Sequence, residues 1–129
     1  MKITNTGIAI ASGLLTVWLS ASVATATNPD DFVLKSTEDF LNVCQTSPKE
    51  DLYTAAIHFC HGYAVGVFQY YQTLAIQGGG ELVCLPDPRP SRSETIDQLM
   101  TWTKSHPQYM SQPAAETIMR FLLEKYGCK

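Results

Sequence analysis

Apolar residues recur along this chain at the three- and four-residue spacing of amphipathic helices. The longest pattern predicts a helix from Lys49 or Glu50 to Ile76. Because its apolar face is wide, we expect this helix to be central and packed by others on more than one side. The inward residues form two stripes, Leu52, Ala56, Phe59, Tyr63, Val67, Tyr70 and Leu74, and beside them Tyr53, Ile57, Cys60, Ala64, Phe68 and Tyr71.

Three shorter helices are predicted around the long one. The first begins near Ser36 or Thr37, either of which can cap it, and is broken at Ser47-Pro48. The next is capped by Ser93 and stops at His106-Pro107, and the last begins at Pro113 and has Gly127 as its C-cap. Their expected inner residues are Ile96, Leu99, Met100 and Thr103, followed by Ala115, Ile118, Met119, Leu122 and Tyr126.

The connection from Gly78 to Arg92 carries three prolines, which forbid a regular helix there. No alternating pattern of useful strand length occurs. The sequence therefore predicts an all-α fold, a compact bundle of about four helices with one long central helix.

The first 26 residues have the layout of a secretory signal peptide. Lys2 precedes an uncharged apolar run from Gly7 to Leu19, and small residues follow up to Ala24-Thr25-Ala26. We expect cleavage after Ala26, because the run is shorter than a bilayer-spanning helix requires. An uncleaved membrane anchor is the alternative. Residues 27–129 would then form a single mature domain with no membrane attachment.

Charge limits the classes of partner. Without Lys2 the chain has eight basic and twelve acidic residues, a formal charge of −4. No basic stripe is present, which argues against nucleic-acid binding. The acidic balance would suit a basic protein partner, although such a charge also serves solubility.

All four cysteines lie after the predicted cleavage site. An even number of cysteines in an exported chain indicates two disulfides, but four cysteines allow three pairings. From the predicted helix positions we favour Cys44–Cys60, between the first two helices, and Cys84–Cys128, which would hold the chain end.

Histidine and cysteine side chains are the remaining candidates for metal binding or catalysis. His58 and His61 share a helix face near Cys60, but no further ligand is evident, so no metal or other cofactor is expected. A cysteine nucleophile needs a free thiol, and paired cysteines leave none. No catalytic motif is present, and we expect a binding protein rather than an enzyme.

Two features point to packing or binding. Gly62 and Gly66 flank Tyr63 in the long helix, where each glycine is costly unless another helix approaches closely, within the fold or across a homodimer. The Gly78–Arg92 connection is long for a helical bundle, and we expect it to be a recognition loop. Its candidate partner-binding residues are Gly79, Glu81, Leu82, Asp87, Arg89 and Arg92.

Several short motifs in order resemble one family. They are Phe40-Leu41-x-x-Cys44, Cys60-x-Gly62-Tyr63-x-x-Gly66, Cys84-Leu85-Pro86, His106-Pro107, Pro113-Ala114-Ala115 and Tyr126-x-Cys128. The set, which spans about residues 37–128, is similar to the Rap/Tai immunity proteins of type VI secretion.

The resemblance implies a periplasmic helical domain, often a homodimer, that binds a secreted toxin and blocks it. In the Tai-type group the toxin is a cell-wall amidase with a cysteine active site. The Gly78–Arg92 loop has no clear counterpart in that pattern, so the identity of the toxin, and even its existence, stays open. The alternatives are a periplasmic chaperone for acid or envelope stress, driven by carboxylates and histidines, and an orphan binding domain without a cognate toxin.

Overall fold

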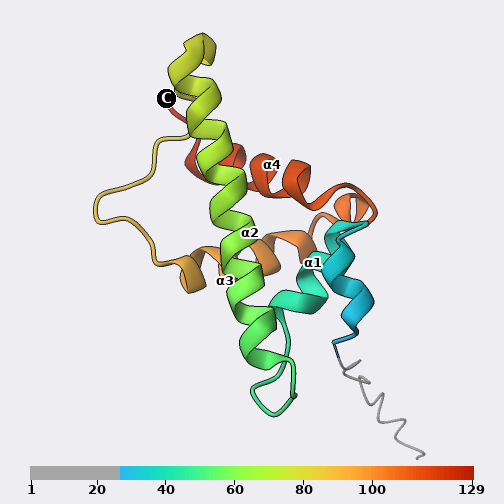
Figure 1. Cartoon of the computed structure of the whole chain (residues 1–129). Helices are drawn as coiled ribbons and strands as arrows, with labels where there is room; N and C mark the ends of the chain where they lie inside the picture. The colour runs from blue at the N-terminus through green and yellow to red at the C-terminus, as the bar shows by residue number, and fades with distance from the viewer. Residues whose placement is uncertain (1–26) are drawn as a thin grey trace, which may run out of the picture.

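The computed structural model describes residues 27–129, which form four α-helices joined by turns (Figure 1). The helices are α1 (Thr37–Cys44), α2 (Tyr53–Leu74), α3 (Arg92–Lys104) and α4 (Ala114–Tyr126). Two 3-10 turns are η1 (Pro29–Val33) and η3 (Pro107–Tyr109), and a π turn, η2 (Ala75–Gly79), continues α2. Residues 27–129 contain no strand, only one antiparallel bridge between Val83 and Gly127. The predicted all-α fold is confirmed, whereas the predicted signal peptide (1–26) lies outside the described residues.

Capping boxes set the starts of two helices. At α1 the Ser36 hydroxyl accepts the hydrogen bond of the Asp39 N–H, and the Asp39 carboxylate accepts that of the Ser36 N–H. The start predicted for α3 was wrong, because Ser91 and not Ser93 is its cap. Ser91 has a glutamate three residues later, Glu94, which completes the same reciprocal pair of hydrogen bonds.

The long helix begins and ends differently from the prediction. It starts at Tyr53, because the chain from Ser47 to Leu52 is folded into turns. The Glu50 carboxylate accepts hydrogen bonds at 2.8 Å from the N–H groups of both Ser47 and Thr27. At the other end α2 stops at Leu74, before the predicted Ile76, and the π turn that follows contains Gly78, whose φ of 111° glycine adopts readily.

The core lies where α1, α3 and α4 meet one face of α2. Phe40, Val43 and Phe121 have at most 1% of their surface exposed. The inner face predicted for α4 was partly wrong, because the helix is rotated. Its buried residues are Ala114, Thr117, Ile118, Phe121 and Leu122, whereas Ala115, Met119 and Tyr126 are only half-buried.

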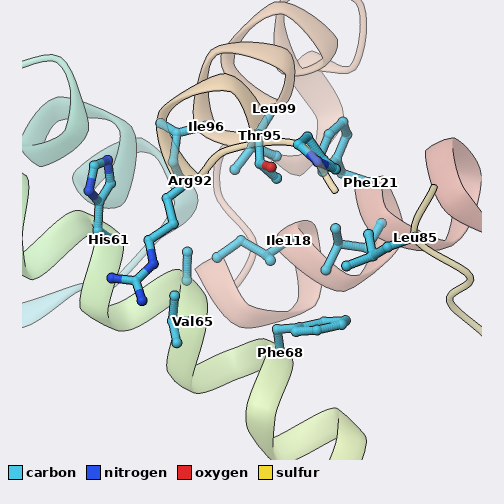
Figure 2. A pocket seen from close by; sticks show the side chains of 13 residues that line it. His61, Val65, Phe68, Leu85, Arg92, Thr95, Ile96, Leu99, Ile118 and Phe121 are labelled. Atoms are coloured by element: carbon cyan, nitrogen blue, oxygen red, sulfur yellow. The ribbon is translucent and has the colours of Figure 1, made fainter. Parts of the chain in front are cut away.

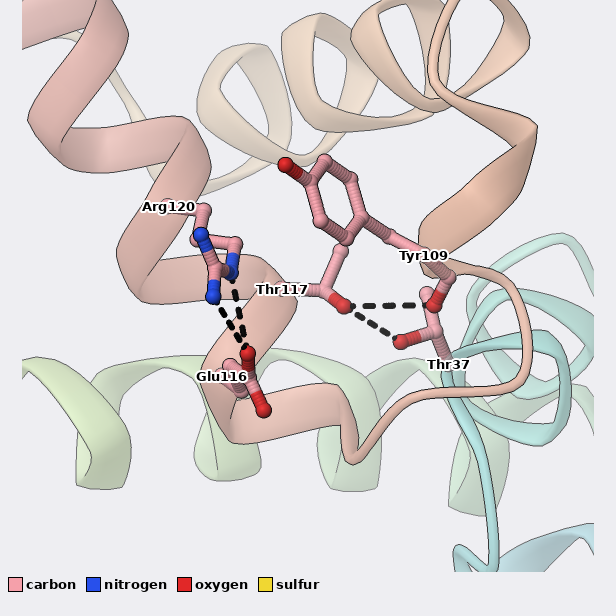
Figure 3. Close-up of polar contacts among 5 residues, drawn as sticks. All are labelled: Thr37, Tyr109, Glu116, Thr117 and Arg120. Atoms are coloured by element: carbon pink, nitrogen blue, oxygen red, sulfur yellow. Dashed lines mark hydrogen bonds and ion pairs between the residues drawn. The ribbon is translucent and has the colours of Figure 1, made fainter.

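A buried polar cluster joins α1, η3 and α4 (Figure 3). The hydroxyl oxygens of Thr37 and Thr117 lie 2.7 Å apart, and both residues are at most 1% exposed. The Thr37 hydroxyl donates to the carbonyl of Gln112 at 2.9 Å, and the Thr117 oxygen lies 3.4 Å from the carbonyl of Tyr109. These partners let Thr117 replace an apolar residue in the core.

Both disulfides have the predicted pairing. Cys44–Cys60 joins α1 to α2, with Cα atoms 5.2 Å apart, and both residues are buried. Cys84–Cys128 joins the loop after η2 to the chain end, with Cα atoms 4.9 Å apart, and both residues are exposed. The first bond therefore fixes α1 against α2, and the second fixes the loop after η2 against the chain end.

Candidate partner-binding surface

The loop between η2 and α3, residues 80–91, is fixed along its first half. The hydroxyl of Tyr71, on α2, accepts hydrogen bonds from the N–H groups of Leu82 and Val83. The N–H of Cys84 donates to the Tyr126 carbonyl at 2.7 Å, and the N–H of Cys128 donates to the Leu82 carbonyl at 2.9 Å. Val83 is only 2% exposed, so this part of the loop is anchored in the core.

The predicted partner-binding residues fall into two groups. Glu81, Leu82, Asp87 and Arg89 are exposed along the loop, and Gly79 precedes them in the exposed π turn. Arg92 lies apart from the five, because it is the first residue of α3 and lines a cavity between α2, α3 and α4. The other five residues therefore lie on one continuous projecting segment, which consists of η2 and the loop.

The end of α2 adds an apolar surface to the loop. α2 and η2 project beyond the other helices (Figure 1), so their last turns have no helix beside them. Ile76 is 87% exposed and Leu82 is 53% exposed. The interpretation of Tyr70 and Leu74 as inward residues was wrong, since they are 67% and 46% exposed.

Helix length was the available signal for this overhang. The 22 residues of α2 span about 33 Å, whereas the 13 residues of α3 or α4 span about 20 Å. A helix so much longer than its neighbours cannot be covered along its whole length.

A second apolar surface is a groove between α2 and α4. Its volume is about 630 Å³, and Tyr63 and Gly66 contribute to its α2 wall, with Ala115 and Met119 on α4. A Cβ atom built at Gly62 or Gly66 would have no atom within 4 Å. Close packing within the described chain therefore does not account for the two glycines, while Tyr63 does pack inward, with its ring 5.3 Å from that of Phe40.

One ion pair lies at the rim of this groove. The Arg120 guanidinium donates two hydrogen bonds to Glu116, at 2.7 and 2.9 Å (Figure 3). It also lies 5.1 Å from the centre of the Tyr109 ring. The Glu116 carboxylate raises the pKa of Arg120 through this hydrogen-bonded ion pair. The two opposite charges offset each other at the rim of the groove.

Residues 27–129 show no sign of a metal site or of a membrane-spanning helix. Within that range no group of three or more histidine, cysteine or acidic side chains could hold a metal ion. His58 is exposed and His61 is half-buried beside the cavity that Arg92 lines. Over the same residues, none of the helices has the length and apolar character needed to span a bilayer.

Comparison with known proteins gives one match. A family model described as Rap1a immunity proteins matches residues 36–128. This range starts at the α1 cap, contains all four helices, and ends at the last disulfide cysteine. Neither a curated protein sequence nor a solved structure matches the chain.

Proposed function

Because the chain belongs to the Rap1a immunity protein family, we propose that it protects its producer by binding a type VI-secreted toxin and covering the toxin's substrate cleft. The observation that carries this proposal is the family match over residues 36–128, which includes every element that holds the loop. The protein acts by occlusion, with no catalytic step of its own.

The contact surface that we propose is the projecting segment formed by η2 and the loop. Its apolar side chains, Ile76 and Leu82, stand clear of the fold and can enter a cleft. Hydrogen bonds to Tyr71 and the Cys84–Cys128 disulfide fix the loop before binding, so less entropy is lost on association. Inhibition of a lethal toxin requires nanomolar affinity, about −12 kcal/mol.

The toxin class that we propose is a peptidoglycan amidase with a cysteine nucleophile. Its support is the similarity of the ordered motifs to the Tai-type group. A narrow projecting segment also suits a groove that accepts an extended wall peptide. The proposed site of action is the periplasm, with cleavage after Ala26, and two disulfides suit that oxidising compartment.

We also place a homodimer contact on the α2 groove. Gly62 and Gly66 leave open space for the backbone of a second helix, and the groove beside them is apolar. The groove extends along α2 to Leu74, next to η2, whereas Ile76 and Leu82 are not among its lining residues. Gly66→Leu should reduce dimerisation in light scattering without weakening toxin capture.

The test is affinity capture from the producing species, with a tag placed ahead of Thr27. The expected result is one stoichiometric wall-degrading enzyme, whose activity the purified protein inhibits. Ile76→Glu and Leu82→Glu should each lose that enzyme while their melting temperatures stay unchanged. Val33→Glu is the matched control, since Val33 is 64% exposed but lies on η1.

Other capture results point to the alternative functions. Many unfolded envelope proteins recovered only at low pH would indicate an acid-stress chaperone. Capture of no partner, with cells of the deletion strain still resistant to neighbouring attackers, would contradict the immunity proposal and indicate an orphan domain.

A further inference from the structure

A cavity of about 160 Å³ lies beneath the loop, between α2, α3 and α4 (Figure 2). Ten of its thirteen lining residues are apolar, and only His61, Arg92 and Thr95 are polar. Phe68 and Leu85 close one side, and Ile118 forms part of the floor. Apolar cavities of about 150 Å³ take up molecules the size of benzene, so the space suits a small hydrocarbon group.

Two of the three polar side chains of this cavity, His61 and Arg92, lie on one side, whereas Thr95 lies toward Leu99 and Phe121 (Figure 2). Figure 2 shows the Arg92 side chain reaching from the start of α3 toward α2, to the side where His61 and Val65 lie. Thr95 is already occupied, because its hydroxyl donates to the Ser91 carbonyl at 2.9 Å. His61 and Arg92 therefore remain to bind the polar part of a ligand.

Arg92 is exposed at the edge of the cavity, and within residues 27–129 its guanidinium forms no ion pair with a carboxylate. Arg92 is also the first residue of α3, where the helix dipole already disfavours a positive charge. The acidic residue of that turn, Glu94, accepts hydrogen bonds from Ser91 and Gln98 instead. The guanidinium is therefore free to pair with a bound anion.

We propose that this cavity binds a small amphipathic monocarboxylate, with a hydrocarbon part of about six to eight carbons inside. The carboxylate accepts hydrogen bonds from the Arg92 guanidinium, in the bidentate geometry that this group favours, and from the His61 imidazole. Absence of any acidic residue among the lining residues makes the site selective for anions over cations. The cavity shares Leu85 and Pro90 with the loop, but its test uses octanoate alone and does not depend on the proposed toxin.

Titration with octanoate tests the proposal directly. Protein produced from the full-length gene is followed by methyl NMR, which reports on Val65, Leu85 and Ile118 in the cavity wall. Octanoate should bind one to one and shift these three signals. Octylamine, with the same chain and the opposite charge, and neutral octan-1-ol should each bind at least about tenfold more weakly.

Two variants separate the charged end of the site from its apolar interior. Arg92→Gln should weaken octanoate about tenfold, whereas Arg89→Gln, the same change on the exposed loop, should leave affinity unchanged. Val65→Phe should fill the cavity and abolish binding. If Val65→Phe does not fold, Ala64→Leu serves the same purpose from the neighbouring wall position.

Three results would overturn the proposal. The first is that octanoate shifts none of the cavity signals. The second is that octan-1-ol binds as tightly as octanoate, or that Arg92→Gln has no effect. The third is that the cavity signals shift with protein concentration alone, which would assign the space to a second copy of the chain. Toxin capture is not part of this test, so either idea can fail without the other.

Discussion

The phenol oxygen of Tyr71 lies 2.8 Å from the backbone nitrogen of Val83 and accepts its hydrogen bond. The same oxygen accepts the N–H of Leu82. One side chain of α2 thus supplies the partner for two successive loop amides that no strand or helix satisfies. The position of the candidate toxin surface depends directly on this hydroxyl.

Removal of that hydroxyl should loosen the loop. Tyr71→Phe leaves two amides without their acceptor, so we expect a loss of about 1–2 kcal/mol in unfolding free energy. Amide exchange at Leu82 and Val83 should accelerate. Tyr70→Phe is the control, because Tyr70 is 67% exposed and its hydroxyl forms no hydrogen bond within residues 27–129. Equal effects of the two changes would contradict the role assigned to Tyr71.

The two disulfides should differ in accessibility. Cys84 and Cys128 are exposed, whereas Cys44 and Cys60 are 7% and 1% exposed, so mild thiol treatment should reduce Cys84–Cys128 first. Alkylation followed by mass spectrometry measures the order.

Removal of each disulfide gives a second comparison. Their sequence separations of 16 and 44 residues correspond to losses of about 3 and 4 kcal/mol in the chain-entropy description. Faster amide exchange in the loop should accompany only the Cys84→Ala/Cys128→Ala pair. Equal loop exchange in the Cys44→Ala/Cys60→Ala pair would show that the loop does not depend on its own bond.

Glu50 should make stability depend on pH at the acid end. Hydrogen bonds from the Ser47 and Thr27 amides lower the pKa of its carboxyl in the folded state. Its stabilising effect is therefore present above the unfolded-state pKa and is lost as the pH falls through the lower folded-state value. Glu50→Gln should lower the melting temperature near neutral pH, and the difference from the unaltered protein should close at acid pH.

Asp51→Asn is the control for Glu50→Gln, because Asp51 is the adjacent carboxylate and is exposed. It should show no such pH-dependent gap. A gap for Glu50→Gln that stays constant down to strongly acid pH would contradict the assignment, because it would not depend on the carboxylate charge.

The buried threonine pair should be sensitive to isosteric replacement. Thr117→Val keeps the volume but leaves the Thr37 hydroxyl without one partner, and we expect a loss of about 1–3 kcal/mol in unfolding free energy. Thr101→Val is the matched control, since Thr101 is exposed and only donates to the carbonyl of Asp97. If denaturant unfolding gives the same small change for both, the hydroxyl pair contributes little to stability.

Local signals in the sequence predicted the number and order of the helices, and the expected helix positions favoured the disulfide pairing that the structure has. Ser36 is one of the two expected caps of α1, and Gly127 is the expected end of α4, where a Cβ atom would lie 2.5 Å from the Leu123 carbonyl oxygen. The error at Ser93 came from overlooking the Ser91-x-x-Glu94 spacing, which is the capping-box pattern. Helix boundaries therefore depend on short-range hydrogen bonds, which the spacing of the capping residues indicates.

Features that depend on distant residues were not predictable in the same way. Thr117 is buried because Thr37 and Tyr109 satisfy its hydroxyl, and no pattern within α4 indicates this. Tyr70 and Leu74 have the spacing of core residues but remain exposed, because they line an open groove between α2 and α4. The cavity at Arg92 likewise requires three helices and a loop to be placed together.

The bond between Cys84 and Cys128 also decides how the protein can be labelled. Lys129 follows Cys128 directly, and the Cys128 amide is held by the Leu82 carbonyl, so the carboxyl end emerges from the side of the projecting segment. Thr27, held by Glu50, lies toward the opposite end of α2 (Figure 1). A reporter domain fused after Lys129 would lie beside the proposed toxin surface, so a strain with this fusion should lose protection although the domain itself is folded.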